Sequence, residues 1–522
     1  MKKRFITGIL ILINACASAQ LQKGKPNIIF IMSDDHAYQA VSAYRDRFQF
    51  VAPTPNIDRL AKEGKRFDRC LVTNSLCGPA RAVILTGKYS HINGFYSNSG
   101  ADFDGSQQTF PKLLQLAGYE TAIIGKWHLG SAPTGFNHWE VLDEQGQYYN
   151  PDFINPEGKH REQGYVTDLI TEKSLDWLAE VQKSGKPFLL MMHHKAPHRE
   201  WEPNLKDLPF YRGAVFPEPS SLFDDYSGRG AAAHQQKMSV SLDMRMDADL
   251  KMWNDTTGAD YARTRGRMDP GQAITWDHFY DSIHRELNKL NPTGAELVKW
   301  KYQRYMYDYL SCIHAVDESV GKILDYLKAT GLDQNTIVVY TSDQGFYLGE
   351  HGWFDKRFMY EQSYRTPLLI RWPGEIAPGT ANRDIVSNLD FAETFLDAAG
   401  VPVPPAMQGR SMLPILKGHT PPDWRKEHYY HYYEYPAVHS VKRHYGISTD
   451  RYVLIHFYYD IDEWELYDLK KDPQEMKNVY RDPAYSTVKK NLKQRLNTLR
   501  IQYREKGDPE MKAVNNIQNG KN

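Results

Sequence analysis

Short runs of consecutive apolar residues recur along the chain, and a polar cluster follows most of them. Such runs, rich in β-branched residues and bounded by polar positions, are typical of strands that are buried on both faces. Five of them span residues 27–32, 121–125, 188–192, 337–340 and 367–371. A segment that contains charged or imidazole side chains follows each of the first four. The pattern predicts a sheet with polar groups at several strand ends.

Segments with helical periodicity lie between these runs, at residues 56–64, 110–117, 168–181, 298–329 and 390–399. Several end at glycine, the usual C-terminal stop of a helix. Strands that alternate with helices predict an α/β fold, in which a mainly parallel sheet is flanked by helices on both faces. Because ligands bind at the carboxyl ends of parallel strands, the four polar strand ends predict one shared site.

Two regions differ from this pattern. Residues 203–290 are polar, rich in Gly and Asp and weakly periodic, and we interpret them as an inserted excursion that shapes the mouth of the site. Beyond residue 413, short strands at 429–435, 445–448 and 452–459 and a helix at 484–504 predict a small α+β subdomain. We therefore expect a main domain at 24–413, this C-terminal subdomain at 414–506 and a tail at 507–522.

The first residues have the pattern of an export signal. Residues 2–4 are basic, residues 5–13 are apolar, and Ala-Ser-Ala at 17–19 offers the small residues that signal peptidase recognises. We expect residues 1–19 to be removed by cleavage after Ala19, and the protein to be periplasmic or secreted. The alternatives are lipoprotein processing at Cys16 and a short buried helix. No later run reaches the roughly 18 apolar residues of a transmembrane helix.

Composition narrows the function classes. The 522 residues include 64 basic and 64 acidic side chains, and this zero net charge argues against nucleic-acid and membrane-surface binding. With 41% hydrophobic and 13% aromatic residues, disorder, collagen and coiled coil are excluded. Four cysteines are too few for a disulfide scaffold, and Cys70 and Cys312 either pair or remain buried thiols.

The most informative stretch is Cys77-Gly78-Pro79-Ala80-Arg81, followed by Leu-Thr-Gly at 85–87. The cysteine opens a predicted helix, and a thiol at a helix N-terminus lies in positive potential and is easily activated. Taken alone, a buried cysteine beside a helix start explains this position equally well. The C-x-P-x-R spacing with the following Leu-Thr-Gly is much rarer than a lone cysteine.

Three further motifs accompany this one: Asp34-Asp35, Gly125-Lys126-Trp127-His128 and Ser342-Asp343-Gln344-Gly345. In this order and at these separations, the motifs resemble those of the type I, formylglycine-dependent sulfatases of the alkaline-phosphatase superfamily. The resemblance covers about residues 25–500 and implies an alkaline-phosphatase-like version of the predicted fold. It also implies a sulfuric ester hydrolase.

The resemblance implies that a formylglycine-generating maturation enzyme oxidises Cys77 to formylglycine, which then serves as the nucleophile. The commonest family motif has Ser where this chain has Ala80. This departure leaves the C-x-P-x-R core intact and concerns the choice of maturation enzyme more than the chemistry.

Oxygen-bearing side chains at two predicted strand ends predict a metal site. Asp34, Asp35, Asp343 and Gln344 offer hard oxygen ligands, which suit calcium better than zinc. Either motif alone would be an ordinary turn. With the family resemblance, we expect a Ca²⁺ ion that the modified Cys77 also contacts.

Sulfate-ester cleavage needs an in-line nucleophile, cations around the sulfate oxygens and an acid for the leaving alcohol. In the resembled family, Arg81 would hold the nucleophile and the carboxylates, and Lys126 and Lys356 would bind sulfate. His128 would accept a proton from the nucleophile hydrate, and His198 would protonate the leaving oxygen. A zinc cluster of His193, His194 and His198 is the alternative reading, although the spacing is not that of a known zinc motif.

Several features favour a sulfated saccharide as the substrate. The chain is rich in aromatic residues, Trp201 and Trp353 lie near predicted site loops, and the protein is predicted to be exported. Asp355 and Arg357 flank the sulfate-binding lysine, so we expect them to contact hydroxyls of the same sugar ring. We expect His444, in the C-terminal subdomain, to contact the substrate too.

Residues 126–136, 148–151 and 193–201 are similar to those of exported bacterial sulfatases that remove 6-O-sulfate from N-acetylglucosamine or N-sulfoglucosamine. We therefore expect this specificity, with action on a terminal residue of a host glycan such as heparan sulfate or mucin. The alternatives are a sulfatase for 2-O-sulfated uronic acid or galactose sulfate, and a phosphonate or phosphodiester hydrolase on the same scaffold. A non-catalytic glycan-binding protein is disfavoured because competent residues fill every proposed catalytic position.

Overall fold

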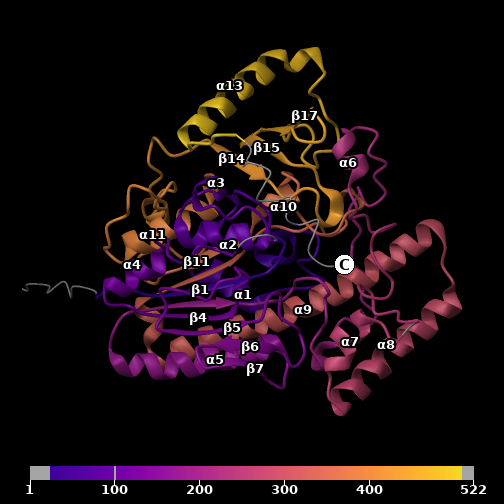
Figure 1. Ribbon diagram of the computed structural model, residues 1–522, viewed down its shortest axis with the longest axis horizontal. Coiled ribbons are helices and arrows are strands. Elements are labelled where there is room, and N and C mark those ends of the chain that lie inside the picture. Colours follow the sequence, from indigo (N-terminus) through magenta and orange to yellow (C-terminus); the bar gives the residue numbers. More distant parts are fainter. Residues whose placement is uncertain (1–23, 99–101, 255, 508–522) are drawn as a thin grey trace, which may run out of the picture.

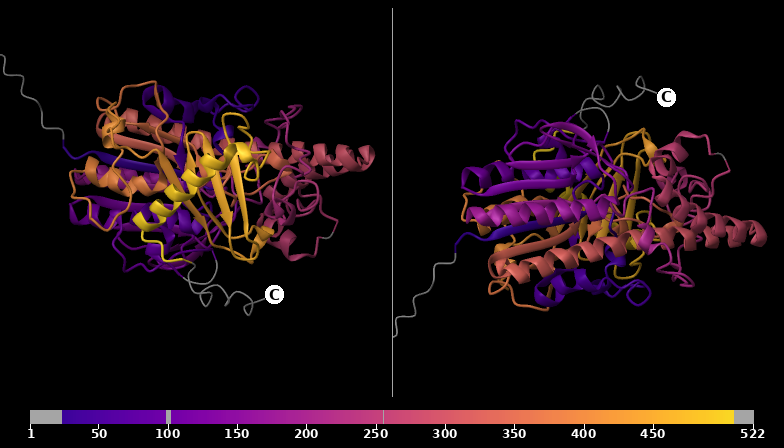
Figure 2. Two further views of the ribbon diagram at one scale, coloured as in Figure 1. Left: turned by 90° about the horizontal axis from the view of Figure 1, so that it is seen from above. Right: turned by 90° about the horizontal axis from the view of Figure 1, so that it is seen from below.

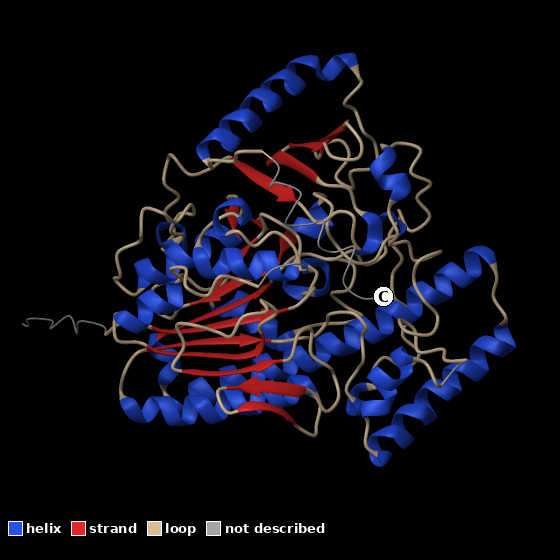
Figure 3. Ribbon diagram, viewed as in Figure 1, coloured by secondary structure: helices blue, strands red, loops and turns tan. Residues whose placement is uncertain are grey.

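The computed structural model describes residues 24–98, 102–254 and 256–507. At its centre is a ten-stranded sheet with the strand order β12-β2-β11-β9-β1-β8-β4-β5-β6-β7 (Figures 1 and 3). Neighbouring strands from β9 to β5 pair in parallel, whereas β11 is antiparallel to β9 and β6 is antiparallel to β5. The predicted α/β fold with a mainly parallel sheet is confirmed.

The strands of this sheet are β1 (Asn27–Ser33), β2 (Lys65–Phe67), β4 (Glu120–Lys126), β5 (His138–Leu142), β6 (Asp152–Asn155), β7 (Gly158–Arg161), β8 (Phe188–His193), β9 (Thr336–Ser342), β11 (Leu368–Arg371) and β12 (Thr380–Asn382). A small second sheet contains β3 (Cys70–Leu71), β10 (Arg365–Thr366) and β13 (Val386–Ser387). All five predicted strands are present. The strands of these two sheets that were missed are two to five residues long, too short for an apolar run to mark them.

Helices cover both faces of the large sheet (Figure 2). α5 and α9 pack together on one face, and α4 and α11 pack together on the other, where α2 joins them. The α-helices are α1 (Pro55–Glu63), α2 (Cys77–Thr86), α3 (Ser90–Asn93), α4 (Phe110–Leu116), α5 (Val166–Val181), α6 (Ala231–Gln235), α7 (Ala259–Thr264), α8 (Pro270–Leu290), α9 (Gly294–Thr330), α10 (Glu361–Tyr364), α11 (Phe391–Ala398), α12 (Leu413–Leu416) and α13 (Ser486–Gln502).

The central strand β1 shows why the strand sequences are almost continuously apolar. Ile29 and Ile31 pack into the apolar cluster that contains α9, whereas Phe30 faces the opposite cluster. There its ring lies edge-on to Phe391 and Phe395 of α11, with both centroid distances 5.6 Å. Burying each such side chain stabilises the fold by about 1.5–3 kcal/mol, so both faces demand apolar residues.

Residues 203–290 are less of an excursion than their polar sequence indicates. They supply Phe216, Leu222 and Trp276 to the apolar cluster around α9. They also contain the 21-residue helix α8, whose N-terminus is closed by a capping box between Asp269 and Gln272. The polar outer face of α8 conceals its periodicity, and the sequence analysis did not predict this helix.

The chain ends in a four-stranded antiparallel sheet with the order β14-β15-β16-β17, and Figure 1 shows α13 along its outer side. These strands are β14 (Glu427–Tyr432), β15 (His444–Thr449), β16 (Tyr452–Phe457) and β17 (Glu463–Asp468). The predicted small C-terminal antiparallel sheet is confirmed, with β17 as a strand that the sequence analysis missed. The boundary at residue 413 stays a prediction.

The predicted signal peptide at 1–19 and the alternative lipid site at Cys16 lie outside the described residues, as does almost all of the predicted tail. Within the described ranges, no helix combines the length and the apolar character that a membrane span requires.

Candidate active site

The polar strand ends meet at one edge of the ten-stranded sheet. β1 pairs with β8 and β9, so that Met32 lies opposite His193 and Ser33 lies opposite Ser342. On the far side of β8, Gly125 of β4 also lies opposite His193. Because these strands are parallel and in register, the segments that follow them emerge side by side. Residues more than 300 positions apart in the sequence are brought together in this way.

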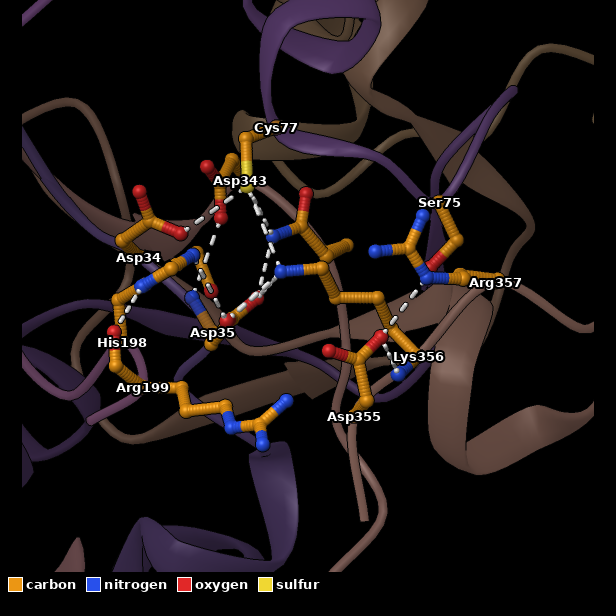
Figure 4. A network of polar contacts seen from close by, with 12 residues as sticks. Asp34, Asp35, Ser75, Cys77, His198, Arg199, Asp343, Asp355, Lys356 and Arg357 are labelled. Carbon is orange, nitrogen blue, oxygen red and sulfur yellow. Dashed lines mark hydrogen bonds and ion pairs between the residues drawn. The ribbon is translucent and has the colours of Figure 1, made fainter. Parts of the chain in front are cut away.

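Cys77 is the first residue of α2, and its sulfur faces the carboxylates and a lysine of this edge (Figure 4). Its Sγ lies 3.3 Å from Asp34 Oδ1, 3.5 Å from Gln344 Nε2 and 3.4 Å from Lys356 Nζ. All residues of α2 are buried, which fixes the direction of the helix and therefore the position of the thiol. The helix N-terminus adds positive potential at this position.

Two cations bind the carboxylates beside the thiol. Arg81 Nη2 donates to Asp34 Oδ2 at 3.1 Å and to Asp343 Oδ2 at 2.9 Å, and its Nη1 donates to the Lys126 carbonyl at 2.7 Å. Lys126 forms an ion pair with Asp34 and donates to Gln145 Oε1. Burial alone would raise the pKa of Asp34. The surrounding cations, Lys126 foremost, nevertheless hold this pKa well below its usual range.

Lys356 binds the second aspartate of the Asp34-Asp35 pair. Its Nζ contacts both oxygens of Asp35, at 2.6 and 2.7 Å, and Gln344 Nε2 donates to Asp35 Oδ1 at 2.6 Å. Burial nevertheless raises the pKa of Asp35 to about 7, against the attraction of Lys356. Burial and the neighbouring Asp34 also raise the pKa of Asp343. The positive charges around Asp35 and Asp343 therefore only partly offset the cost of burying these two carboxylates.

Two histidines complete the edge. His198 follows β8, and its Nε2 lies 3.8 Å from Asp35 Oδ2. His128 follows β4, and its Nδ1 has no hydrogen-bond partner among the described residues. Burial, and then the charge of Lys126, lowers the pKa of both imidazoles, because each disfavours the protonated ring.

A second polar group lies next to Lys356, farther from the thiol. Arg357 Nε donates to Asp355 Oδ1 at 3.0 Å, and its Nη1 donates to Glu434 Oε2 at 2.6 Å. His439 Nε2 lies 3.2 Å from the other Asp355 oxygen. Burial opposes ionisation of Asp355, but His439 and Arg357 hold its pKa well below the usual range. Glu434 and His439 lie between β14 and β15, so the C-terminal sheet contributes to this group.

Comparisons with known proteins identify the family. A family model described as Sulfatase matches residues 26–401, and one described as N-sulphoglucosamine sulphohydrolase, C-terminal, matches residues 349–502. The chain belongs to the sulfatase family. It is therefore a sulfuric ester hydrolase, with the alkaline-phosphatase-like sulfatase fold.

Individual relatives also support membership of the sulfatase family. The sulfatase is 53% identical over 513 residues to an N-acetylglucosamine-6-O-sulfatase of Bacteroides thetaiotaomicron, a match that covers 96% of this chain and 90% of the relative. It superposes with a TM-score of 0.90, at 52% identity, on a solved protein in complex with its substrate D-glucosamine-2-N,6-O-disulfate, covering 93% of this chain and 99% of that one. A phosphonate monoester hydrolase from Silicibacter pomeroyi, 21% identical with a TM-score of 0.67 over 93% of this chain and 97% of its own, shares the fold alone.

The acidic end of the sulfatase site fits a hard cation. One oxygen from each of Asp34, Asp35 and Asp343 lies within 4.8 Å of the others, and all three residues are buried. Gln344 Oε1, also buried, accepts no hydrogen bond from the described residues. Three buried carboxylates and this amide oxygen form a donor set made only of oxygens, which suits Ca²⁺ rather than Zn²⁺.

Cys77 in its encoded form is a poor nucleophile in this sulfatase. Burial, and then the negative charge of Asp34, raises the pKa of its thiol to about 12, despite the helix N-terminus and the two nearby lysines. At neutral pH the thiol therefore stays protonated. A protonated thiol is a weak nucleophile for attack on an ester.

Three residues that were expected near the sugar are fully buried in the structure. His444 is fully buried, its Nε2 accepts from the Met359 backbone N–H at 3.0 Å, and its Nδ1 contacts the Lys442 carbonyl at 2.7 Å. Both ring nitrogens are thus used within the fold. Trp201 and Trp353 are also fully buried, in the apolar cluster around α9, and offer no face to a sugar.

The alternative zinc cluster does not form among the described residues. His193 Nδ1 contacts the Lys126 carbonyl at 3.1 Å, and His194 Nε2 contacts Ser319 Oγ at 3.2 Å, so neither is grouped with His198. Cys70 and Cys312 are both free buried thiols, which answers the open question of their pairing.

Sequence reasoning missed Gln145, Glu434 and His439. Gln145 could have been found, because it follows β5 and β5 pairs in parallel with β4, placing Lys126 opposite Leu142. The run that forms β5 is short and was not predicted as a strand. No local signal distinguishes Glu434 or His439 from other polar residues of the tyrosine-rich C-terminal segment.

Proposed function

We propose that this sulfatase hydrolyses the 6-O-sulfate ester of a terminal N-acetylglucosamine or N-sulfoglucosamine residue of a glycan. The observation that carries the proposal is 52–53% identity, across almost the whole chain, to proteins that act on or bind 6-sulfated glucosamine. The group formed by Asp355, Arg357 and His439 supports it. This group adjoins Lys356 and offers both donors and acceptors to ring hydroxyls.

We further propose that Cys77 is converted to formylglycine by a maturation enzyme, and that Asp34, Asp35, Asp343 and Gln344 hold Ca²⁺ beside it. When present, the modified residue supplies the attacking hydroxyl and the ion supplies positive charge at the sulfate. The pKa of the thiol and the all-oxygen donor set are the observations that support these two groups.

The side chains of the protein orient and polarise the ester. Lys126 pairs with Asp34 and Lys356 contacts the Cys77 sulfur, so that both ammonium groups can bind sulfate oxygens and stabilise the negative charge that develops in the transition state. Arg81 holds the carboxylates of Asp34 and Asp343 in place, and we assign sulfate binding to the two lysines. Buried as they are, these charges act with little screening by water.

The two histidines move protons at opposite ends of the reaction. His198 donates a proton to the leaving O6 of the sugar, because its Nε2 is directed at the cluster while its Nδ1 contacts the Arg199 carbonyl. The bound anionic sulfate opposes the burial that lowers the pKa of this ring, and so favours its protonated form. His128 accepts a proton from the side chain at position 77 through a ring nitrogen.

Asp355 and Arg357 bind hydroxyls of the sugar ring. His439 contacts the sugar in place of His444, to which the sequence analysis gave that contact. The Asp355 carboxylate is held ionised and therefore acts as an acceptor, whereas Arg357 donates. A group of this kind closes one end of the pocket and favours a terminal residue. Export of the protein, with residues 1–19 as its signal, would bring it to extracellular glycans.

A set of positional isomers tests the proposal. Purified, matured enzyme should release sulfate from N-acetylglucosamine 6-sulfate and from the N-sulfo, 6-sulfo analogue, but not from the 3-sulfate, 2-O-sulfated uronic acid or galactose sulfates. Ion chromatography of free sulfate is the readout. Faster release from any other isomer, or faster hydrolysis of a phosphonate ester, would replace this specificity with one of the alternatives.

A further inference from the structure

A cavity of about 900 Å³ opens beside the catalytic edge, at the carboxyl ends of β4 and β5. Its size lies within the roughly 300–1,000 Å³ range of ligand pockets. The lining side chains that matter here are Trp127, His128, Trp139, Asp143, Glu144 and Gln145. Apart from His128 and Gln145, none of them has a part in the chemistry described above.

The cavity borders the sulfate-binding side of the active site, because it shares His128 and Gln145 with it. Lys126 of β4 lies opposite Leu142 of β5, so the residues that follow both strands share one edge. The Lys126 ammonium donates to Gln145 Oε1, and Gln145 also lines the cavity. His128 contributes to the cavity wall as well. A substrate anchored by its sulfate can therefore extend into this space.

The wall has a chemistry of its own. Two indoles, from the almost buried Trp127 and the half-buried Trp139, offer flat apolar surface. Asp102, Asp143 and Glu144 add three carboxylates, whereas the described lining residues include no lysine and no arginine. Lys159, which pairs with Asp143 at 2.6 Å, is more than half exposed and outside the lining. Such a wall repels an anionic ligand and suits an uncharged one with apolar faces and hydroxyls.

We propose that this cavity is a subsite for an uncharged hexose or N-acetylhexosamine linked to the sulfated glucosamine. The inference rests on the proposed function and deepens it, because it selects among parent glycans. A glycan in which the neighbouring sugar is neutral fits the wall. A glycan in which the neighbour is a uronic acid places a carboxylate against three others.

Three substrates test the subsite with the wild-type holoenzyme. They are 6-sulfo-N-acetylglucosamine alone, the same residue linked to galactose, and the same residue linked identically to galacturonic acid. The two disaccharides differ only at one carbon, which is a hydroxymethyl group in the first and a carboxylate in the second. We expect kcat/KM for the galactose compound to exceed both other values by about tenfold or more, equivalent to about 1.4 kcal/mol.

Variants then assign the effect to the wall. Trp139→Ala should lower kcat/KM for the galactose compound to the monosaccharide value, and Trp139→Phe should retain part of the gain. The double variant Asp143→Asn, Glu144→Gln should raise kcat/KM for the galacturonic acid compound several-fold. Both should leave the monosaccharide value unchanged. Glu180→Gln, on the exposed face of α5, is the matched control and should change none of the three.

Equal kcat/KM values for all three compounds, or the highest value for the galacturonic acid compound, would overturn the subsite while leaving the proposed function intact. A Trp139→Ala variant that lowers all three values equally would also overturn it, because the residue would then act on the fold or on the catalytic centre. No sulfate release from any of the three would defeat the proposed function and this inference with it.

Discussion

At the scale of single residues, the site combines groups whose environments push their pKa values in opposite directions. Asp34 stays ionised because lysine and arginine side chains surround it, whereas the adjacent Asp35 has a pKa raised to about 7 by burial. The thiol of Cys77, in the same cluster, has a pKa raised to about 12. Perturbed groups gathered at one end of a sheet are typical of catalytic sites, and the raised thiol pKa is the observation on which the proposed modification of Cys77 rests.

The role of His198 as the acid predicts a dependence on the leaving group. His198→Ala should lower kcat/KM on N-acetylglucosamine 6-sulfate by about 10²–10⁴-fold, because an alkoxide is a poor leaving group without a proton. The same variant should lose far less on an aryl sulfate, whose phenolate leaves without an acid. Steady-state rates on both substrates provide the measurement. Equal losses on the two would remove His198 from the acid role.

The role of Arg357 in recognising the sugar ring predicts a different effect on the two substrates. Arg357→Lys keeps the positive charge but loses the fork that bonds Asp355 and Glu434 together. We expect KM for N-acetylglucosamine 6-sulfate to rise by about 10-fold or more, while an aryl sulfate is turned over almost normally. A parallel fall in activity on both substrates would show that the residue supports the catalytic centre instead of the sugar.

Much of the residue-level site could be predicted, and the failures have a physical reason. Asp34, Lys126 and Asp343 were predicted because each lies within three residues of the end of an apolar run, and parallel strands bring such ends together. His444 was placed in the pocket only by its position in the C-terminal segment. The backbone turn that carries His439 to Asp355 instead leaves no pattern in the sequence, since it depends on how two sheets pack.

At the scale of elements, apolar runs predicted the strands that are buried on both faces. β5, β6 and β7 were missed because they are the outermost strands on one side of the ten-stranded sheet, where one face is polar and only a few residues pair. This omission concealed Gln145 and the cavity beside it. Helix positions followed from periodicity where one face meets the sheet, and failed for α8, which packs mainly on other helices and loops.

Helix α11 carries a buried carboxyl that makes stability depend on pH. Burial, and then Asp390, raises the pKa of Glu393 to about 8, above its ordinary value of 4.5. The folded protein therefore keeps a proton that the unfolded chain releases. The resulting stabilisation is complete below about pH 4.5 and is lost as the pH rises toward 8.

Replacing Glu393 with its neutral isostere Gln should remove this pH dependence of stability. Between pH 5 and 8, Glu393→Gln should gain stability relative to the wild type by an amount on the order of a few kcal/mol, because each pKa unit corresponds to about 1.4 kcal/mol. Gln can still accept the hydrogen bond from the Gly409 N–H, which Glu393 Oε1 accepts at 2.6 Å. Denaturant unfolding at several pH values measures the difference. A difference that stays constant with pH would contradict the assignment.

At the scale of the whole molecule, the active site joins the two sheets. The ten-stranded sheet supplies the nucleophile position, the carboxylates and the histidines, whereas the segment between β14 and β15 supplies Glu434 and His439. An ion bound at the carboxylates would neutralise charge that the fold buries at this junction. Its binding should therefore stabilise the entire folded chain.

Calcium is accordingly expected to raise the midpoint of thermal unfolding. Treatment with a chelator should lower it by a few °C and reduce sulfate release, and added Ca²⁺ should restore both. Asp343→Asn, which removes one charge from the donor set, should weaken the response to calcium. Identical unfolding curves with and without chelator, for the wild type and the variant alike, would argue against a metal at this site.

The central proposal for this sulfatase is that turnover requires oxidation of Cys77 within this cluster. Mass spectrometry of the peptide that contains residue 77, across preparations matured to different extents, measures the oxidised fraction directly. The initial rate of sulfate release from N-acetylglucosamine 6-sulfate should rise in proportion to that fraction and extrapolate to zero where the cysteine is unmodified. Full activity in a preparation whose Cys77 is entirely unmodified would contradict the account.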